Sequence, residues 1–267
     1  MGGKLGFRSM NTEIFAQKIA EQGWVILDQF IDRETVDRVN EDMAKAYETC
    51  REIQVKNGVG GNTDGSVHHV LIFKGGFLDL LSRSIPMELI TSYFDGKFIL
   101  NSFGGIINLP NKPTYACNAH RDIRFFVKDT PLMLTMLIML DDFTLENGAT
   151  YVLGGSHLTP EKPSDEYFAK NADRAVGKAG SVLVFNSSLW HAAGHNQTHV
   201  IRRALTLTFT KPFMKPQFDY CGALGVEYVK TLSEDVKQLV GLYSRVPTSL
   251  DEWYQPPENR MYRVGQD

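Results

Sequence analysis

Two side chains that can bind a metal ion stand close together in "NAHRDIRFF", residues 118–126. They are His120 and Asp122. In an extended strand, residues i and i+2 point to the same side, so the imidazole and the carboxylate can converge on one point while Arg121 points elsewhere. Taken alone, the pair fits a polar surface pair as well as a metal site. The distinction depends on a third ligand farther along the chain.

His191 is the candidate third ligand. It follows His120 by 71 residues and stands behind the apolar run "SVLVF", so a neighbouring strand can return it to the same point. Two histidines and one carboxylate bind one face of a metal and leave positions open, which suits Fe(II) when oxygen and a cosubstrate bind side by side. A zinc hydrolase can use the same three ligands with one water, so the metal stays open between iron and zinc.

Arg202 is the candidate cosubstrate residue. In "RRALTLTFT" read as a strand, Arg202 shares a polar face with Ala204, Thr206 and Thr208, while Arg203 and the intervening apolar residues occupy the other face. A guanidinium inside a pocket needs an anionic partner, because an unpaired buried charge is costly, and a dicarboxylate could supply one through paired hydrogen bonds. An internal ion pair with an aspartate or glutamate is the alternative.

Thr135 is the one hydroxyl within the apolar run "PLMLTMLIML". A buried hydroxyl needs a hydrogen-bond partner. Its partner is expected to be either a neighbouring carbonyl or the carboxylate that Arg202 binds.

The elements that must position these residues begin with helices. The first is expected in "NTEIFAQKIAEQG", before a short strand in "WVILDQF", and a second runs from a cap at Asp32 to about Arg51. Shorter helices are expected near Phe77 to Arg83 and Met87 to Phe94. The glycine-rich "VKNGVGGNTDGS" predicts a loop.

Strands dominate the middle of the chain. The candidates are "FILNSFGGIINL", "LMLTMLIMLDDF", "ATYVLGG", "SVLVFNSS" and "RALTLTFTK". Strands without intervening helices pair mainly antiparallel, which predicts an α+β fold with a mainly β core, a sandwich or barrel flanked by helices. A last helix in "SEDVKQLVGLYSRV" is expected to cover a sheet face or a pocket rim. No internal repeat or linker interrupts the chain, so we expect one domain.

Composition limits the partners and the location. The 267 residues contain 43% hydrophobic residues and carry a net charge of −3, which gives no broad electrostatic reason to bind nucleic acid or an anionic membrane. No run approaches the ~18 apolar residues of a spanning helix. Three widely separated cysteines favour a reducing compartment, so a cytoplasmic location is expected. We further expect a monomer or homodimer acting on a small molecule, and residues 1–10 as a leader or disordered segment.

The motifs together resemble one family. "AHRD", "LENGATYVLGGSH" and "LWHAAGHNQTHVIRRA" are similar in order and spacing to the phytanoyl-CoA dioxygenase family of Fe(II)/2-oxoglutarate oxygenases, roughly from Gly23 to Lys211. The resemblance implies a double-stranded β-helix, the jelly-roll or cupin-like fold. It implies helical support over 11–95, a β-helix core over 96–215 and a helical extension over 216–267.

The resemblance also implies roles for individual residues. His120, Asp122 and His191 match the iron ligands, and Arg202 matches the residue that binds the far carboxylate of 2-oxoglutarate. Thr135 stands where some members use a hydroxyl for the same carboxylate. Asn101, in "LNSFGG", is a weaker match to a position that lines the cosubstrate site.

The sequence departs from the family at two places. Ala193 replaces a frequent serine, which removes one cosubstrate hydrogen bond, and Gly154 replaces the proline of a "PGSH" turn, which is expected to loosen it. Tyr115 and Arg124 are expected near the pocket, where Arg124 would meet a substrate anion or form a surface ion pair.

The remaining histidines are expected outside the triad. His157 is predicted to stabilise a turn, and His195 and His199 to be exposed. His68 and His69 are expected at a strand edge or at the pocket mouth.

The predicted function is oxidation, most simply hydroxylation, of a small molecule, with 2-oxoglutarate converted to succinate and CO2. Demethylation, desaturation and cyclisation are alternative outcomes of the same chemistry. A metal-dependent isomerase or hydrolase on a similar barrel would need the triad without 2-oxoglutarate, so succinate formation separates the two classes. A binding protein without catalysis is disfavoured, because three ligands and the arginine occur together.

Overall fold

The computed structural model describes residues 10–61, 63–112, 115–127 and 130–266. Apart from Met10, which packs partly buried against the core, the leader expected at residues 1–10 lies outside the described residues. Within the described ranges, no helix combines the length and the apolar character that crossing a membrane requires.

The first two helices begin at the predicted caps. Helix α1 spans Thr12–Glu21 behind Asn11, and α2 spans Arg33–Lys56 behind Asp32, whose side chain accepts a hydrogen bond from the N–H of Thr35. Strand β1, Trp24–Leu27, joins them. Helix α2 is longer than its apolar spacing predicted, because its last turn continues into polar sequence.

Two short helices and a 3₁₀ turn follow the glycine-rich loop. Helices α3, Gly75–Arg83, and α4, Met87–Phe94, agree with the prediction. Strand β2 contains only Ser66–Val67, and Val70–Phe73 forms a 3₁₀ turn. His69 precedes this turn in a left-handed conformation, with φ 55°.

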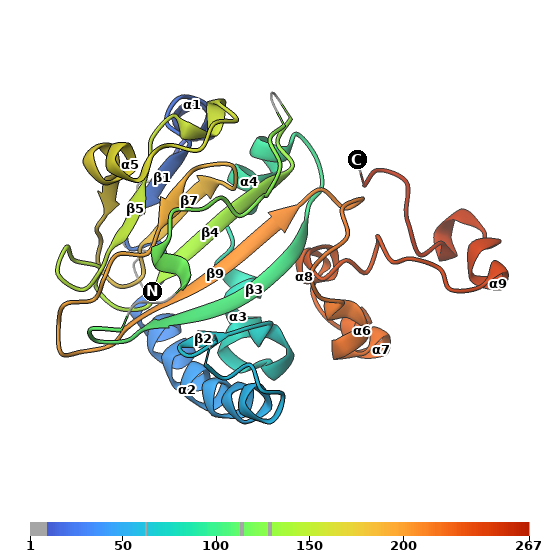
Figure 1. The fold of residues 1–267 in the computed structure, drawn as a ribbon. Helices are drawn as coiled ribbons and strands as arrows, with labels where there is room; N and C mark the ends of the chain where they lie inside the picture. Colours follow the sequence, from blue (N-terminus) through green and yellow to red (C-terminus); the bar gives the residue numbers. More distant parts are fainter. Residues whose placement is uncertain (1–9, 62, 113–114, 128–129, 267) are drawn as a thin grey trace, which may run out of the picture.

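The described strands form two antiparallel sheets (Figure 1). The larger has six strands in the order β1-β7-β4-β9-β3-β2, and the smaller has three in the order β6-β5-β8. The remaining strands of the large sheet are β3 Ile99–Asn108, β4 Met133–Met139, β7 Val182–Asn186 and β9 Arg202–Thr210. Those of the small sheet are β5 Thr150–Val152, β6 Asp173–Ala175 and β8 His191–Ala192, with helix α5, Asp165–Asn171, between β5 and β6.

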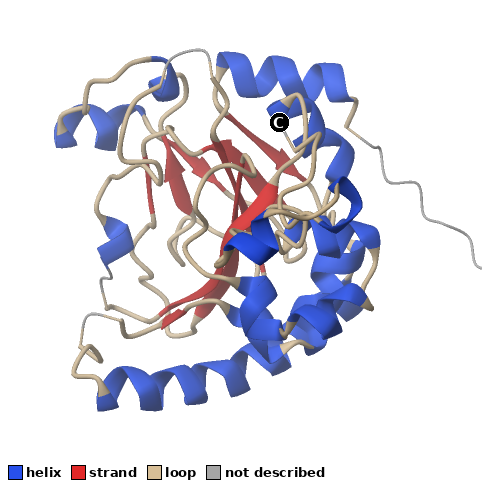
Figure 2. Cartoon of the chain, turned by 90° about the vertical axis from the view of Figure 1, so that its right-hand side faces the viewer, coloured by secondary structure: helices blue, strands red, loops and turns tan. Residues whose placement is uncertain are grey.

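The large sheet is covered differently on its two faces. One face packs on the helices, and in β9 it is formed by Leu205, Leu207 and Phe209. The other face packs on the small sheet around Leu183 and Ala204. In the view of Figure 2, the largest group of helices lies to the right of and below the strands. The inner space between the sheets is therefore the place where a pocket can form, and the α+β prediction is confirmed.

The C-terminal region is divided into short helices. These are α6 Tyr220–Leu224, α7 Val226–Lys230, α8 Glu234–Leu239 and α9 Leu250–Trp253, and α9 lies on an arm that projects from the body (Figure 1). The single last helix predicted over "SEDVKQLVGLYSRV" was wrong in extent. It ends before Gly241, which adopts φ 77°. Helix α8 nevertheless packs on the large sheet, where Gln238 donates to the carbonyl of Phe98 at 3.2 Å.

Three further 3₁₀ turns complete the regular elements within the part of the chain that the structure describes. They are Tyr115–Cys117, Ser156–Leu158 and Pro257–Asn259. The first two flank the segments that approach the cavity between the sheets.

Candidate metal centre

His191 begins strand β8 of the small sheet, shortly after β7 of the large sheet ends. The residue is buried, with 7% exposed, and its ring packs beside the Phe185 ring at 4.6 Å between centroids. His191 and His120 exchange two backbone hydrogen bonds of 2.9 and 3.0 Å. This single bridge brings together two residues that are far apart in sequence.

The segment with His120 and Asp122 is not the extended strand that the sequence predicted. Only His120 forms a β-bridge, and the chain bends from Asp122 to Phe125. The backbone N–H groups of Asp122 and Ile123 both donate to the carbonyl of Ser187, at 3.0 and 3.2 Å. Contacts with other parts of the chain, and not a strand ladder, therefore fix this segment.

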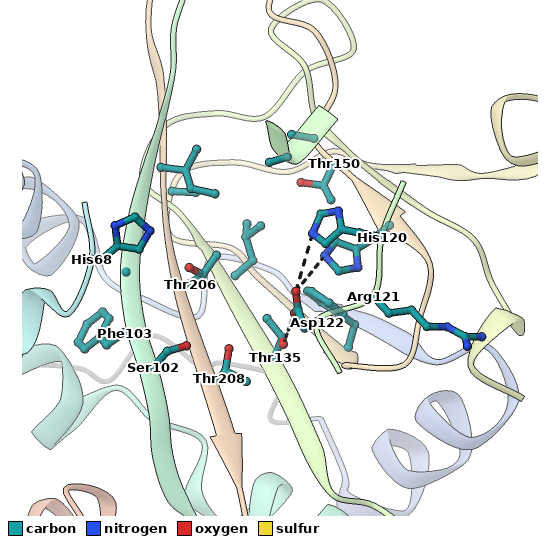
Figure 3. A pocket seen from close by; sticks show the side chains of 18 of the residues that line it. His68, Ser102, Phe103, His120, Arg121, Asp122, Thr135, Thr150, Thr206 and Thr208 are labelled. Carbon is teal, nitrogen blue, oxygen red and sulfur yellow. Dashed lines mark hydrogen bonds and ion pairs between the residues drawn. The ribbon is translucent and has the colours of Figure 1, made fainter. Parts of the chain in front are cut away.

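Arg121 points away from the triad, as predicted (Figure 3). Its guanidinium donates to the carbonyls of Ser156, Thr159 and Pro160, and it lies 4.9 Å from the Trp190 ring centroid. Burial lowers the pKa of this guanidinium, with Glu161 acting in the opposite direction. Arg121 thus ties the metal-ligand segment to the turn after β5.

His120, Asp122 and His191 converge on one point. Their ligand atoms all lie within 4.8 Å of one another. Asp122 Oδ1 lies 3.8 Å from His120 Nε2 and 3.6 Å from His191 Nε2. A metal ~2.1 Å from each ligand atom separates neighbouring ligands by about 3 Å, so the two distances from Asp122 to the histidines need to shorten by less than about 1 Å.

Backbone contacts fix which nitrogen of each histidine faces the metal site. His120 Nδ1 lies 2.8 Å from the carbonyl of Asn118, and His191 Nδ1 lies 3.0 Å from that of Leu189. Since a carbonyl only accepts, Nδ1 carries the proton and Nε2 keeps its lone pair for a metal. Burial lowers the pKa of His191, with Asp122 acting in the opposite direction, so this imidazole is held neutral.

Arg202 enters the same cavity from the start of β9. It is only 2% exposed, donates to the carbonyl of Gly148 at 2.9 Å and lies over the Phe143 ring at 4.2 Å. Its Nε is buried without a hydrogen-bond partner, and the described residues give it no ion pair. Burial lowers the pKa of Arg202 to about 10. This guanidinium can accommodate an anionic ligand.

Arg203 has the opposite environment. Its guanidinium makes two hydrogen bonds to the Asp141 carboxylate, of 2.7 and 3.0 Å, on the other side of β9. The internal ion pair that the sequence left open for Arg202 therefore belongs to Arg203.

The cavity between the sheets has a volume of about 310 Å³ and includes the triad and Arg202. Arg202, Ala204, Thr206 and Thr208 all line it, as the predicted strand face required. Thr150 of β5 and Ser102 of β3 add hydroxyls that the sequence analysis did not identify, because their neighbours carry no distinctive pattern.

Thr135 lines the cavity, but its contact differs from both predicted partners. Its hydroxyl donates to Asp122 Oδ2 at 2.6 Å and lies 2.9 Å from the Ser187 hydroxyl. Ser187 was missed by the sequence analysis. The signal that could have identified it is the polar "NSS" that ends an apolar strand just before His191.

Asn101 does not line the cavity, so its predicted position there was wrong. On β3, Leu100 pairs with Phe209 and Ser102 pairs with Thr208, which leaves Asn101 as an extra residue in a β-bulge. Because a bulge shifts side-chain alternation by one residue, Ser102 takes the cavity-facing position. Asn101 instead donates to the carbonyl of Lys215 at 3.3 Å.

His68 lies on the wall opposite the triad (Figure 3), and His69 lines the same cavity, so the pocket alternative holds for both. His69 stacks on Phe218 at 4.4 Å between ring centroids, and its Nδ1 lies 3.0 Å from the Tyr220 hydroxyl. Burial lowers the pKa of His69 and raises that of Tyr220. His69 is therefore a neutral polar group that Phe218 and Tyr220 hold in place at the cavity.

The other candidates lie as follows. Arg124 and Ala193 line the cavity, and the described residues give Arg124 no ion pair. The side chain of Tyr115 lies outside the described residues. His157 approaches the carbonyl of Ala20 at 3.2 Å beside the turn after β5. His195 and His199 are exposed, as predicted.

Comparison with known proteins points to one family. The family model described as phytanoyl-CoA dioxygenase matches residues 19–204. The Mycobacterium tuberculosis protein named Uncharacterized protein Rv1501 is 33% identical over 251 residues, covering 91% of this chain and 92% of the relative. Dioxygenase cdmA of Talaromyces verruculosus is 30% identical over 210 residues, covering 71% of this chain and 69% of the relative.

Solved structures show the same fold. AviO1 from Streptomyces viridochromogenes is 20% identical with a TM-score of 0.60, covering 78% of this chain and 98% of AviO1. SnoK, described as a non-heme alpha ketoglutarate dependent carbocyclase from nogalamycin biosynthesis, is 19% identical with a TM-score of 0.57, covering 78% of this chain and 87% of SnoK. The predicted cupin-like double-stranded β-helix is confirmed.

Proposed function

This chain belongs to the phytanoyl-CoA dioxygenase family, and on that premise we propose that it hydroxylates a small organic molecule. It is a non-haem Fe(II)/2-oxoglutarate-dependent dioxygenase. The hydroxylation balances as substrate, O2 and 2-oxoglutarate giving hydroxylated substrate, succinate and CO2. Iron with 2-oxoglutarate supplies the oxidant that removes hydrogen from a substrate C–H bond.

We assign iron binding to His120, Asp122 and His191. Their donor set supports this assignment, because two Nε2 atoms and one carboxylate oxygen face one point. Two histidines and one carboxylate leave positions for a cosubstrate, as non-haem iron oxygenases require. Each Nδ1–H holds its imidazole in orientation against a backbone carbonyl.

The single observation that carries the cosubstrate assignment is Arg202, a buried cation in the triad's cavity without an ion pair among the described residues. A hydrolase or isomerase with the same triad would leave this charge uncompensated, which is costly. Arg202 would bind the far carboxylate of 2-oxoglutarate. Nearby apolar side chains, Leu137, Phe185 and Ala204, would keep water away from that charge pair.

The size and polarity of the cavity support a small, polar substrate. Its volume of about 310 Å³ lies at the low end of the roughly 300–1,000 Å³ usual for ligand pockets, and it must also hold 2-oxoglutarate. His68 faces the triad across this space, and His69 lines the same cavity. They offer neutral hydrogen-bonding groups, and Arg124 offers a positive charge at the same cavity. We expect the substrate to lie between these residues and the metal ligands.

The test begins with titration of 2-oxoglutarate into the anaerobic Fe(II) protein, following the metal-to-ligand charge-transfer band. We expect the band with Fe(II) and none with Zn(II). A panel of small metabolites is then screened for succinate formation under ¹⁸O2, and the product is expected to gain one labelled oxygen atom. Absence of both the band and succinate formation would exclude the proposed chemistry.

The same screen separates the alternative outcomes. A product that loses two hydrogens without gaining oxygen indicates desaturation or cyclisation, and release of formaldehyde indicates demethylation. Either result would replace hydroxylation while keeping the cosubstrate chemistry.

A further inference from the structure

Two buried hydroxyls connect the metal site to the large sheet. Thr135 on β4 is 2% exposed, and Ser187 at the end of β7 is fully buried. Thr135 Oγ1 lies 2.6 Å from Asp122 Oδ2 and 2.9 Å from Ser187 Oγ. The three side chains form a continuous hydrogen-bonded chain.

The direction of donation along these hydrogen bonds follows from which of the three side chains can donate and which can only accept. An ionised carboxylate only accepts, so the single hydroxyl proton of Thr135 goes to Asp122. Thr135 Oγ1 then has lone pairs but no second proton, so the Ser187 hydroxyl must donate to it. The order is Ser187 to Thr135 to Asp122. The last bond is charge-assisted, which agrees with its short length.

These hydrogen bonds involve one carboxylate oxygen of Asp122 and leave the other free to bind the metal. Oδ2 is bound by Thr135, whereas Oδ1 is the atom that faces both Nε2 atoms, at 3.6 and 3.8 Å. The carbonyl of Ser187 also accepts from the Asp122 N–H at 3.0 Å. Ser187 therefore fixes the ligand segment through its backbone and its side chain.

We propose that Thr135, oriented by Ser187, is a positioning residue that holds Asp122 so that only Oδ1 binds iron. This inference rests on the proposed function, because it takes Asp122 as an iron ligand. A carboxylate that can rotate is able to bind with both oxygens and would occupy a position that 2-oxoglutarate or oxygen needs. Thr135 thereby keeps the coordination site open.

The assignment replaces the cosubstrate contact that the sequence predicted for Thr135. The hydroxyl has one proton, and Asp122 uses it, so none remains for the carboxylate of 2-oxoglutarate. If Thr135 only satisfied its own burial, its loss would change stability and leave metal binding unchanged. Metal affinity therefore separates a positioning role from a structural one.

The experiment is anaerobic titration of Fe(II) into the metal-free protein, followed by 2-oxoglutarate. We expect Thr135→Val, which keeps the shape and removes the donor, to bind Fe(II) about 10- to 100-fold more weakly, as is usual when a group supporting a ligand is lost. Its charge-transfer band should move to longer wavelength, because a carboxylate freed from a hydrogen bond donates more electron density to iron. Thr135→Ser should restore both properties.

Thr210→Val is the matched control. Thr210 is a fully buried strand threonine on neighbouring β9, and its hydroxyl has no partner among the described residues. Its substitution should leave Fe(II) affinity unchanged. Thermal unfolding of each variant checks that it folds, and Thr135→Ala takes the place of Thr135→Val if valine prevents folding.

A second experiment tests the order of donation from Ser187 to Thr135 to Asp122. Ser187→Ala should weaken Fe(II) binding less than Thr135→Val, and adding it to Thr135→Val should cause little further loss, because both act through one contact. Fully additive losses would overturn the ordered chain. Parental affinity and band position in Thr135→Val would overturn the positioning role while leaving the proposed function intact. Failure of the parent to bind Fe(II) at all would remove both.

Discussion

Strand β9 and the metal-ligand segment, residues 118–126, border one cavity but are held in different ways. Strand β9 pairs with β3 and β4 along nearly its whole length, so its backbone is fixed by ladders on both sides. The ligand segment has one β-bridge, to His191, and otherwise depends on Ser187, Thr135 and the carbonyls that Arg121 contacts.

This difference predicts how each region responds to substitution. On β9 a side chain can be removed without moving its neighbours, because the ladder hydrogen bonds remain. In the ligand segment each side-chain contact is one of a few, so its loss is expected to change the position of a metal ligand. Substitutions on β9 should therefore have separable effects, and those in the ligand segment should affect stability and metal binding together.

The largest effect is expected from the ligands themselves. His120→Ala, Asp122→Ala and His191→Ala should each reduce 2-oxoglutarate turnover to background, because the metal loses one of three protein ligands. Chelators should inhibit the parent, and added Fe(II) should restore it. Succinate formation by each variant is the measurement, and full activity in any one would remove that residue from the triad.

The next largest effect is expected from loss of Arg202 on β9. Arg202→Ala should weaken 2-oxoglutarate binding by about 2–5 kcal/mol, as expected when one partner of a buried charge pair is lost. Fe(II) binding should remain. Arg202→Lys should recover only part of the loss, because an ammonium cannot reproduce the planar two-point contact. Titration of the charge-transfer band measures both variants.

Arg203→Ala is the control for that experiment. It removes the Asp141 ion pair on the opposite face, so it should lower the free energy of unfolding and leave 2-oxoglutarate affinity near the parental value. If Arg203→Ala weakens the cosubstrate as much as Arg202→Ala, the two faces of β9 are not separable and the comparison fails.

A smaller effect is expected from Arg121. Arg121→Met removes the donors to Ser156, Thr159 and Pro160 while keeping an apolar stem against Trp190. We expect the free energy of unfolding to fall by about 1–3 kcal/mol, and Fe(II) to bind several-fold more weakly because the ligand segment loosens. Denaturant unfolding and metal titration measure the two quantities.

Arg174→Met is the matched control for Arg121→Met. Arg174 also donates to backbone carbonyls, those of Ala149 and Leu145, but it supports the small sheet and not the ligand segment. Its loss should reduce stability similarly without changing Fe(II) affinity. Equal effects of the two variants on Fe(II) would show that metal binding responds to general stability alone.

The smallest effect is expected at Thr210 of β9. Its buried hydroxyl has no partner among the described residues, so Thr210→Val removes an unsatisfied polar group. The free energy of unfolding should stay the same or rise by up to about 1 kcal/mol. A clear loss of stability in denaturant unfolding would show that this hydroxyl has a partner.

Local pattern alone predicted much of the site. Alternation along "RRALTLTFT" separated Arg202 from Arg203, because side chains on a regular strand point to opposite faces whatever the rest of the fold does. Capping residues and apolar spacing likewise gave the starts of α1 and α2. The spacing of His120, Asp122 and His191 was sufficient to suggest a metal site.

Contacts between distant parts of the chain decided the rest. The bulge at Asn101 depends on how β3 pairs with β9, so the alternation within "LNSFGG" could not reveal that Ser102 faces the cavity. Thr135 has two hydrogen-bond partners in separate parts of the chain. Asp122 lies 13 residues before it and Ser187 lies 52 residues after it. A side chain's type shows that it needs a partner, but only the packing of the sheets determines which polar atom lies within hydrogen-bonding distance.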